Sequence, residues 1–115
     1  MKYELDDLKT YLRIDIDDDD KILQSLYLTA ENYVHDLVSF NAKLEDLEKI
    51  EQFNQAAILL TGHWYNARYA VAQTTSVKVN NEEIPFGVNA LALQARARYL
   101  DGGAVDDSQP AKQSN

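Results

Sequence analysis

The feature that most constrains the fold is a long apolar repeat in the middle of the chain. Between residues 47 and 72, apolar side chains recur every three or four residues, at Ile50, Phe53, Ala57, Leu60, Trp64, Ala67 and Val71. An average spacing of about 3.5 residues over three heptads predicts one helix that packs against neighbouring helices along most of its length. We therefore predict a helix from Leu47 to Ala72, with Phe53, Leu60 and Trp64 in the core.

Three further patterns predict helices on either side of this one, over Leu5–Leu12, Asp18–Val38 and Val88–Leu100. Apolar residues recur in each at intervals of three and four, as expected for one face of a helix. In the second helix the predicted core face consists of Leu23, Leu26, Ala30, Tyr33 and Leu37, and Ile22 and Val34 widen it. We expect one of the four residues Asp17–Asp20 to cap this helix, and the others to lie favourably near its positive end.

The remaining segments are predicted to be irregular. Residues 39–46 form a loop, and residues 73–87 form a long loop or a small β-hairpin, because Val77-Lys78-Val79 alternates and Asn80-Asn81 favours a turn. The predicted fold is a small all-α bundle of four helices. It occupies residues 1–100 and is followed by a flexible, disordered tail over residues 101–115.

Charge and composition narrow the function classes. The chain has 115 residues, no cysteine and a net charge of −8, and residues 1–53 hold 14 acids against 6 bases. A protein that grips nucleic acid through phosphates needs a basic face, which this balance does not supply. The acidic start of the chain is unlike a signal peptide, and the longest apolar run covers only residues 56–60. We expect a soluble protein without a membrane span.

No motif predicts an active site, a cofactor or a metal. The run Asp15-x-Asp17-x-Asp19 resembles the start of a calcium loop, but Asp20 and Leu26 stand where that loop needs glycine and glutamate. His35 and His63 are the two histidines, and we interpret both as structural. We therefore predict that the protein is not an enzyme.

The aromatic residues indicate an interaction surface instead. Seven tyrosines occur in the chain, and tyrosine is favoured where one side of a residue is apolar and the other is wet. In the third predicted helix, Tyr65, Arg68 and Tyr69 fall off the core face, at spacings of three and four. Tyrosine, tryptophan and arginine are enriched at interface hot spots, so this second face is a candidate contact with a neighbouring subunit. Partly buried core tyrosines are the competing interpretation.

Three blocks of sequence resemble the head-tail connector family of tailed phages and prophages. The first is Leu5-x-x-Leu8-Lys9-x-Tyr11-Leu12-Arg13-Ile14-Asp15, with Asp17–Asp20 and Ala30-Glu31-x-Tyr33-Val34 after it. The second is His63-Trp64-Tyr65-x-x-Arg68, and the third is Ile84-Pro85-Phe86-Gly87-Val88-x-Ala90-Leu91. The blocks lie in the family's order between residues 5 and 100. Asn66-Ala67 stands where a charged pair is commoner, and the polar tail leaves the C-terminal contact open.

The resemblance implies an α-helical adaptor that assembles with itself into a ring, of twelve copies in the family pattern. The ring would lie below the portal protein of the DNA-filled head and join it to a stopper, head-completion or tail protein. DNA would pass through the lumen without specific binding. The protein would belong to the virion and occur in the host cytoplasm during assembly.

The segment between the third and fourth helices is a second candidate contact. Val77, Val79, Ile84 and Phe86 are apolar, although their surroundings are polar. A segment that pairs with a neighbour can seat such alternate side chains in pockets. We predict that Phe86 or Val88 anchors the fourth helix to its own subunit, with Pro85 stiffening the entry and Gly87 permitting a tight turn. Residues 77–84 would reach an adjacent subunit or the portal, unless they form a hairpin packed on their own helices.

Two other function classes stay open on sequence grounds. The acid excess before residue 54 also suits an acidic regulatory adaptor, or a DNA mimic that binds a basic protein. A metal-dependent hydrolase using Asp15–Asp20 is a third class, weakened by the incomplete motif.

Overall fold

The computed structural model describes residues 2–73 and 84–102, with side chains for residues 2–67 and 84–102. In this part of the chain every regular element is a helix: α1 (Leu5–Leu12), α2 (Asp20–Val38), α3 (Leu44–Leu47), α4 (Glu51–Gln73) and α5 (Phe86–Leu100). The predicted all-α fold is confirmed. The predicted hairpin residues 77–83 and the tail beyond residue 102 lie outside the described residues.

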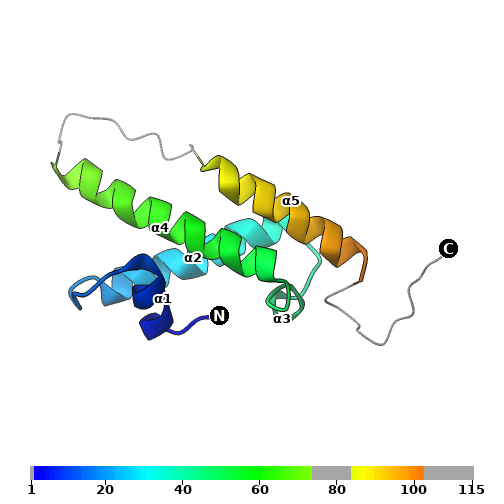
Figure 1. Cartoon of the computed structure of the whole chain (residues 1–115), viewed down its shortest axis with the longest axis horizontal. Coiled ribbons are helices and arrows are strands. Elements are labelled where there is room, and N and C mark those ends of the chain that lie inside the picture. Colours follow the sequence, from blue (N-terminus) through cyan, green and yellow to red (C-terminus); the bar gives the residue numbers. More distant parts are fainter. Residues whose placement is uncertain (1, 74–83, 103–115) are drawn as a thin grey trace.

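The bundle is organised around α4 (Figure 1). This helix packs against α2 on one side and α5 on another, and α2 and α5 also contact each other. The short α1 lies across α2 and α4 at the end of the bundle that is far from α3. The long apolar repeat thus lies in a helix that contacts α1, α2 and α5.

Helix α1 has the predicted bounds, and both of its ends are fixed locally. At its start, the Glu4 backbone N–H donates to the Asp7 carboxylate at 3.1 Å, within a capping box. At its end, Arg13 adopts a left-handed conformation with φ of 59°. Helix α1 also comes close to α4 at Gly62, where a Cβ atom would lie 2.9 Å from Leu12 Cδ2. A larger residue at position 62 would therefore push the end of the Leu12 side chain aside.

The predicted helix over Leu47–Ala72 is wrong at its start. The chain forms the short α3 first, turns through residues 48–50 and begins α4 at Glu51. The buried Asn54 side chain donates from Nδ2 to the Glu48 carbonyl at 2.9 Å. This bond satisfies a carbonyl at the turn, so a polar residue in the apolar repeat marks where two helices meet.

The core face of α2 is rotated from the predicted one. Its buried apolar residues are Leu23, Tyr27, Ala30, Val34 and Val38. Leu37 is 39% exposed and Tyr33 37% exposed, so placing them in the core is wrong. Leu26 is half-buried, and Leu23 is fully buried. Both faces of α2 carry apolar residues at helical spacing, and contact with the neighbouring helices selects the one that is buried.

In α4, Phe53 and Leu60 are fully buried, whereas Trp64 is half-buried. The Trp64 ring packs edge-to-face on Tyr33 of α2, with ring centroids 6.3 Å apart. This tryptophan therefore covers the edge of the core, rather than its middle.

The core divides into two clusters. The first, which we call the apolar cluster, joins α2, α4 and α5 through Ala30, Val34, Val38, Ala42, Leu47, Ile50, Phe53, Ala56, Leu60, Val88, Ala92 and Ala95. The second, the tyrosine cluster, joins α1, α2 and α4 through Leu8, Leu23, Tyr27, Ala57, Ile58 and Tyr65. Within residues 2–73 and 84–102, no helix is both long and apolar enough to cross a bilayer.

Candidate functional site

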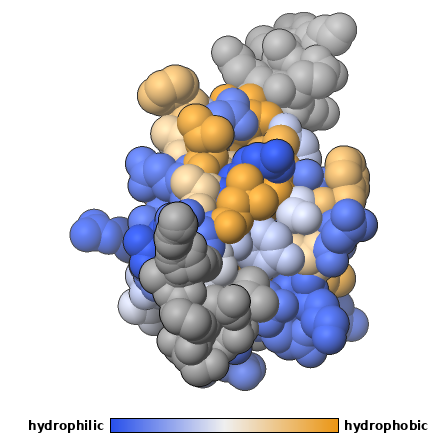
Figure 2. Space-filling view, turned by 90° about the vertical axis from the view of Figure 1, so that its right-hand side faces the viewer, coloured by the Kyte–Doolittle hydropathy of each residue, from blue (hydrophilic) through white to orange (hydrophobic). Residues whose placement is uncertain are grey.

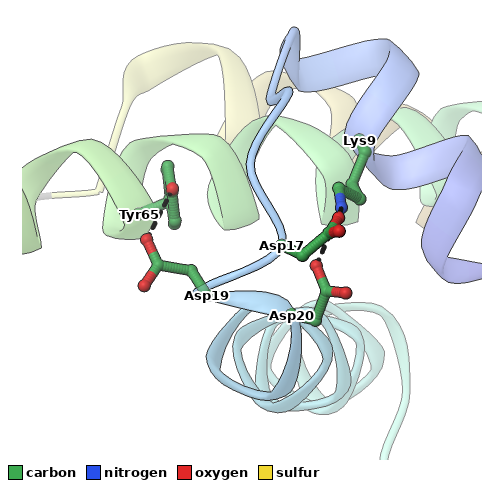
Figure 3. Close-up of polar contacts among 5 residues, drawn as sticks. All are labelled: Lys9, Asp17, Asp19, Asp20 and Tyr65. Carbon is green, nitrogen blue, oxygen red and sulfur yellow. Dashed lines mark hydrogen bonds and ion pairs between the residues drawn. The ribbon is translucent and has the colours of Figure 1, made fainter.

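The aspartate run between α1 and α2 is tied to neighbouring elements (Figure 3). Lys9 Nζ of α1 donates to Asp17 Oδ1 at 2.5 Å and to Asp20 Oδ1 at 2.9 Å. Hydrogen bonding to these two carboxylates raises the pKa of Lys9, and the same ammonium group lowers the pKa of Asp17. The run thus joins the end of α1 to the start of α2.

Asp19 and Tyr65 form a second tie (Figure 3). Asp19 occupies the N-cap position of α2, but its side chain makes no capping bond there. The Tyr65 hydroxyl of α4 donates to Asp19 Oδ2 at 2.8 Å instead. Tyr65 is 6% exposed and belongs to the tyrosine cluster. The prediction that it faces a neighbouring subunit is wrong, because its ring packs within its own subunit.

Polar side chains of α2 bind the segment that precedes α1, and one of them, the Glu31 carboxyl, is buried. The Tyr3 backbone N–H donates to the Tyr27 hydroxyl at 3.2 Å, and the Lys2 backbone N–H donates to Glu31 Oε2 at 3.3 Å. Glu31 is fully buried, and burial raises the pKa of its carboxyl. Burial, together with the Tyr11 hydroxyl, raises the pKa of Tyr3 to about 12. These groups hold the chain ahead of α1 against α2.

His35 ties the end of α2 to the following loop. Its Nε2 lies 2.7 Å from the Ala42 carbonyl oxygen, and its Nδ1 lies 3.0 Å from Asp36 Oδ1. Burial lowers the pKa of His35, but the Ala42 carbonyl and the Asp36 carboxylate raise it more, so the pKa lies above its ordinary value. This geometry is that of a structural histidine.

An apolar groove runs between α1, α4 and the start of α5. It has a volume of about 550 Å³ and is lined by Tyr11, Leu12, Gln55, Ile58, Leu59, Gly62, His63, Asn66, Pro85 and Leu91. Of these side chains, Tyr11 is 52% exposed and Leu59 41% exposed. A concave apolar surface of this kind is suited to receive apolar side chains from another molecule.

The predicted contact residues around the start of α5 have unlike environments. Pro85 lines the groove, and Phe86 is 85% exposed. Gly87 lies inside α5 rather than in a turn, and a Cβ there would lie 3.0 Å from Leu59 Cδ2. Val88 is fully buried and anchors α5, while the half-buried Ile84 packs on the apolar cluster of its own subunit. The reach predicted for Ile84 toward a neighbour stays a prediction, since part of its side chain remains exposed.

Four other predicted contact residues cannot be placed by contacts. Val77 and Val79, and the side chains of Arg68 and Tyr69, lie outside the described residues.

Helix α5 has an apolar face that points away from the core, and Phe86 is the residue of this face that the predicted contact residues include. Leu93 is 69% exposed and Leu100 66% exposed, and both follow Phe86 at intervals of seven residues. Figure 2 views the molecule from the right-hand side of Figure 1. Apolar residues gather in the upper part of this view, at the height where α5 lies in Figure 1. The interval of seven is visible in the sequence.

Comparisons with known proteins give a family. The family model of the phage gp6-like head-tail connector protein matches residues 2–96, which covers α1 to α4 and most of α5. No curated protein and no solved structure matches the chain. The match spans well over half of the sequence and includes the elements that build both clusters and the groove. The chain therefore belongs to the phage gp6-like head-tail connector family.

Proposed function

We propose that the protein is the subunit of a ring that joins the portal of a phage head to the stopper or tail. The family match is the observation that carries this proposal. The ring would contain twelve copies and stand at the head-tail junction of the virion, and genome DNA would pass through its lumen. Its partners would be other copies of the chain, the portal protein and a head-completion or tail protein.

Two structural features support a ring. A ring closes through heterologous contacts, so each subunit needs two different surfaces that complement each other. This subunit has a concave apolar groove beside α1 and a convex apolar face on α5. Exposed apolar residues in such number are typical of proteins that bury them on assembly.

The charge of the chain supports passage of DNA over binding of DNA. A net charge of −8 gives the phosphate backbone few cations to contact. An acidic lumen would repel the duplex and leave it free to slide. A gel-shift assay at low salt checks this property: we expect no retarded DNA, and retention that disappears at higher salt would contradict it.

The proposal is tested by mixing the pure protein with the portal protein encoded in the same phage genome. Size-exclusion chromatography with light scattering should show a complex whose mass exceeds the portal ring by many copies of the 13.1 kDa chain. Negative-stain images should show an added ring on one end of the portal. A chain that never binds the portal ring would contradict the proposal, whereas a chain that is monomeric alone would not.

The acidic-adaptor hypothesis makes a different prediction. A DNA mimic should displace DNA from a basic DNA-binding protein in a competition assay and should show no affinity for portal rings. The family match favours the connector, so we expect no displacement beyond that caused by an acidic protein of equal charge.

A further inference from the structure

Helix α5 carries two apolar stripes on opposite sides. The inner stripe, centred on Val88, Ala92 and Ala95, is buried in the apolar cluster. The outer stripe consists of Phe86, Ala90, Leu93, Ala97 and Leu100. Because a helix turns by about 100° per residue, these five positions share one face, on the far side from the buried one.

The outer stripe has the spacing of a helix–helix contact. Its members follow one another at intervals of four, three, four and three, which is the pattern of a coiled-coil seam. Its three large side chains are 85%, 69% and 66% exposed. The stripe runs the length of α5.

The two segments that flank α5 in the sequence, residues 74–83 and 103–115, are too polar to cover the stripe. The residues after Gly102 contain only Ala104, Val105 and Ala111 as apolar residues, among charged and polar ones. The segment 74–83 contains only Val77 and Val79. Neither sequence has apolar side chains at the spacing that would match five stripe residues.

The groove is the matching surface, and it shares no residue with the stripe. It is lined by α1, α4 and the flank of α5, through Leu91 and Pro85. A groove between helices is the usual seat for the apolar face of another helix.

Charge also matches the stripe to the groove side of the molecule. Helix α5 contains Arg96 and Arg98 and no acid. Arg96 donates to the Val38 carbonyl of its own subunit, at 2.9 Å, while Arg98 is exposed. Residues 2–20, which include the α1 wall of the groove, hold eight acids and three bases. Two α5 helices packed on each other would instead bring arginines together with no acid between them.

We infer that the outer stripe of α5 in one copy docks into the groove between α1 and α4 of the next copy. This contact is head-to-tail, because the two surfaces differ, and it repeats from copy to copy until a ring closes. The inference rests on the proposed function, since it specifies how the proposed ring is held together. The exposed Arg98 would approach the acidic α1 of the neighbour.

The test uses two variants that each break one surface. Leu93→Arg places a cation in the middle of the stripe, and Asn66→Arg places one at the exposed edge of the groove. Gln24→Arg adds the same charge on the exposed side of α2 and is the control. All three positions are exposed, so circular dichroism should show the helical content of the wild type.

Sedimentation of the separate and mixed proteins gives the expected result. Where the wild type associates without the portal, each broken variant alone should remain at 13.1 kDa and the control should associate like the wild type. A mixture of the two should stop at twice that mass, because one intact stripe then meets one intact groove and no further contact is possible. If Leu93→Arg is monomeric while Asn66→Arg still forms dimers, α5 pairs with α5 and the inference is wrong. Where the wild type is monomeric, cross-linking on portal rings decides.

Cross-linking makes the test independent of affinity. The chain has no cysteine, so Leu93→Cys and Asn66→Cys each introduce a single thiol. A short bis-maleimide should join the two variants to each other and should not join either to itself. Absence of the mixed product, both alone and on portal rings, would overturn this contact. Portal binding by the wild type is read separately, so a wrong contact can be told from a wrong function.

Discussion

The two core clusters hold the bundle together in different ways. The apolar cluster contains alanine, valine, leucine, isoleucine and phenylalanine, and it joins the three long helices mainly by packing, with the Arg96 bond to the Val38 carbonyl beside it. The tyrosine cluster has fewer buried residues, and polar bonds surround it: Tyr65 to Asp19, Tyr3 to Tyr27 and Lys9 to the aspartate run. The short α1 cannot bury enough apolar surface to be held by packing, so hydrogen bonds and charges complete its attachment.

This difference has consequences for stability. Apolar packing responds little to pH and salt, whereas ion pairs weaken as salt rises or as their groups titrate. We therefore expect the α1 end of the molecule to loosen under conditions that leave the three long helices packed.

The largest effect should come from the apolar cluster. Phe53→Ala removes a fully buried ring and should lower the free energy of unfolding by about 3–5 kcal/mol. Trp64→Ala should lower the free energy of unfolding by less, although tryptophan is larger. Trp64 is half-buried, so water can fill the space that the missing ring leaves. Urea denaturation of both variants measures the difference. Equal costs would show that Trp64 is as much a core residue as Phe53.

The tyrosine cluster should respond to loss of a single hydroxyl. Tyr65→Phe keeps the buried ring but removes the bond to the Asp19 carboxylate, and should cost about 1.5–3 kcal/mol. Tyr33→Phe is the matched control, because Tyr33 is 37% exposed. If the two changes cost the same, the bond to Asp19 adds nothing to the attachment of α2 to α4.

The buried carboxyl beside this cluster should give an effect of opposite sign. Burial raises the pKa of Glu31, so the folded state holds its proton more tightly than the unfolded chain. Stability from this group is present below its ordinary pKa and is lost as pH rises through the raised value. Glu31→Gln should therefore stabilise the protein at pH 7 by about 1–3 kcal/mol. Urea denaturation between pH 4 and 7 measures it, and an unchanged slope with pH would contradict the prediction.

The smallest effect should come from the ion pairs of the aspartate run. Lys9→Met keeps the length of the side chain but removes the bonds to Asp17 and Asp20. The pKa of Asp17 is lowered, so its contribution is present above the ordinary aspartate pKa and is lost as pH falls through the lowered value. The variant should differ from wild type at neutral pH and low salt, and the two melting temperatures should converge in acid or in high salt. A difference that persists in both would mean that Lys9 acts through packing.

The existence of α1, α2, α4 and α5 could be predicted from the sequence, because each has apolar residues at regular spacing. The short α3 could not, and it lies mostly in the segment 39–46 that is predicted to be a loop. The bounds Leu5–Leu12 were fully specified, since the capping residues and the apolar positions agree. The break between α3 and α4 could not be predicted, because no proline or glycine marks it and the apolar repeat runs through it. It depends on the Asn54 bond to Glu48, which is a contact between side chain and backbone at a turn.

The choice between faces of one helix was also beyond the sequence. In α2 both Leu37 and Val38 fit a helical stripe, and only the packing of α4 and α5 selects Val38. Tyr65 was placed on an outer face, because α1 and the aspartate run that cover it could not be positioned from periodicity. The groove could not be predicted for the same reason, because its walls come from three helices that are distant in sequence.

The two apolar sides of α5 raise the question of which side packs inward as the subunit folds. Turned by half a rotation, the helix would still present apolar residues to α2 and α4. The buried side carries Val88, Ala92 and Ala95, whereas Phe86, Leu93 and Leu100 on the other side are far larger. A reversed helix would overfill a space shaped for small residues, and overpacking costs about 1–3 kcal/mol for each misfit. Side-chain volume, and not polarity, determines which face of α5 the subunit keeps for its own core.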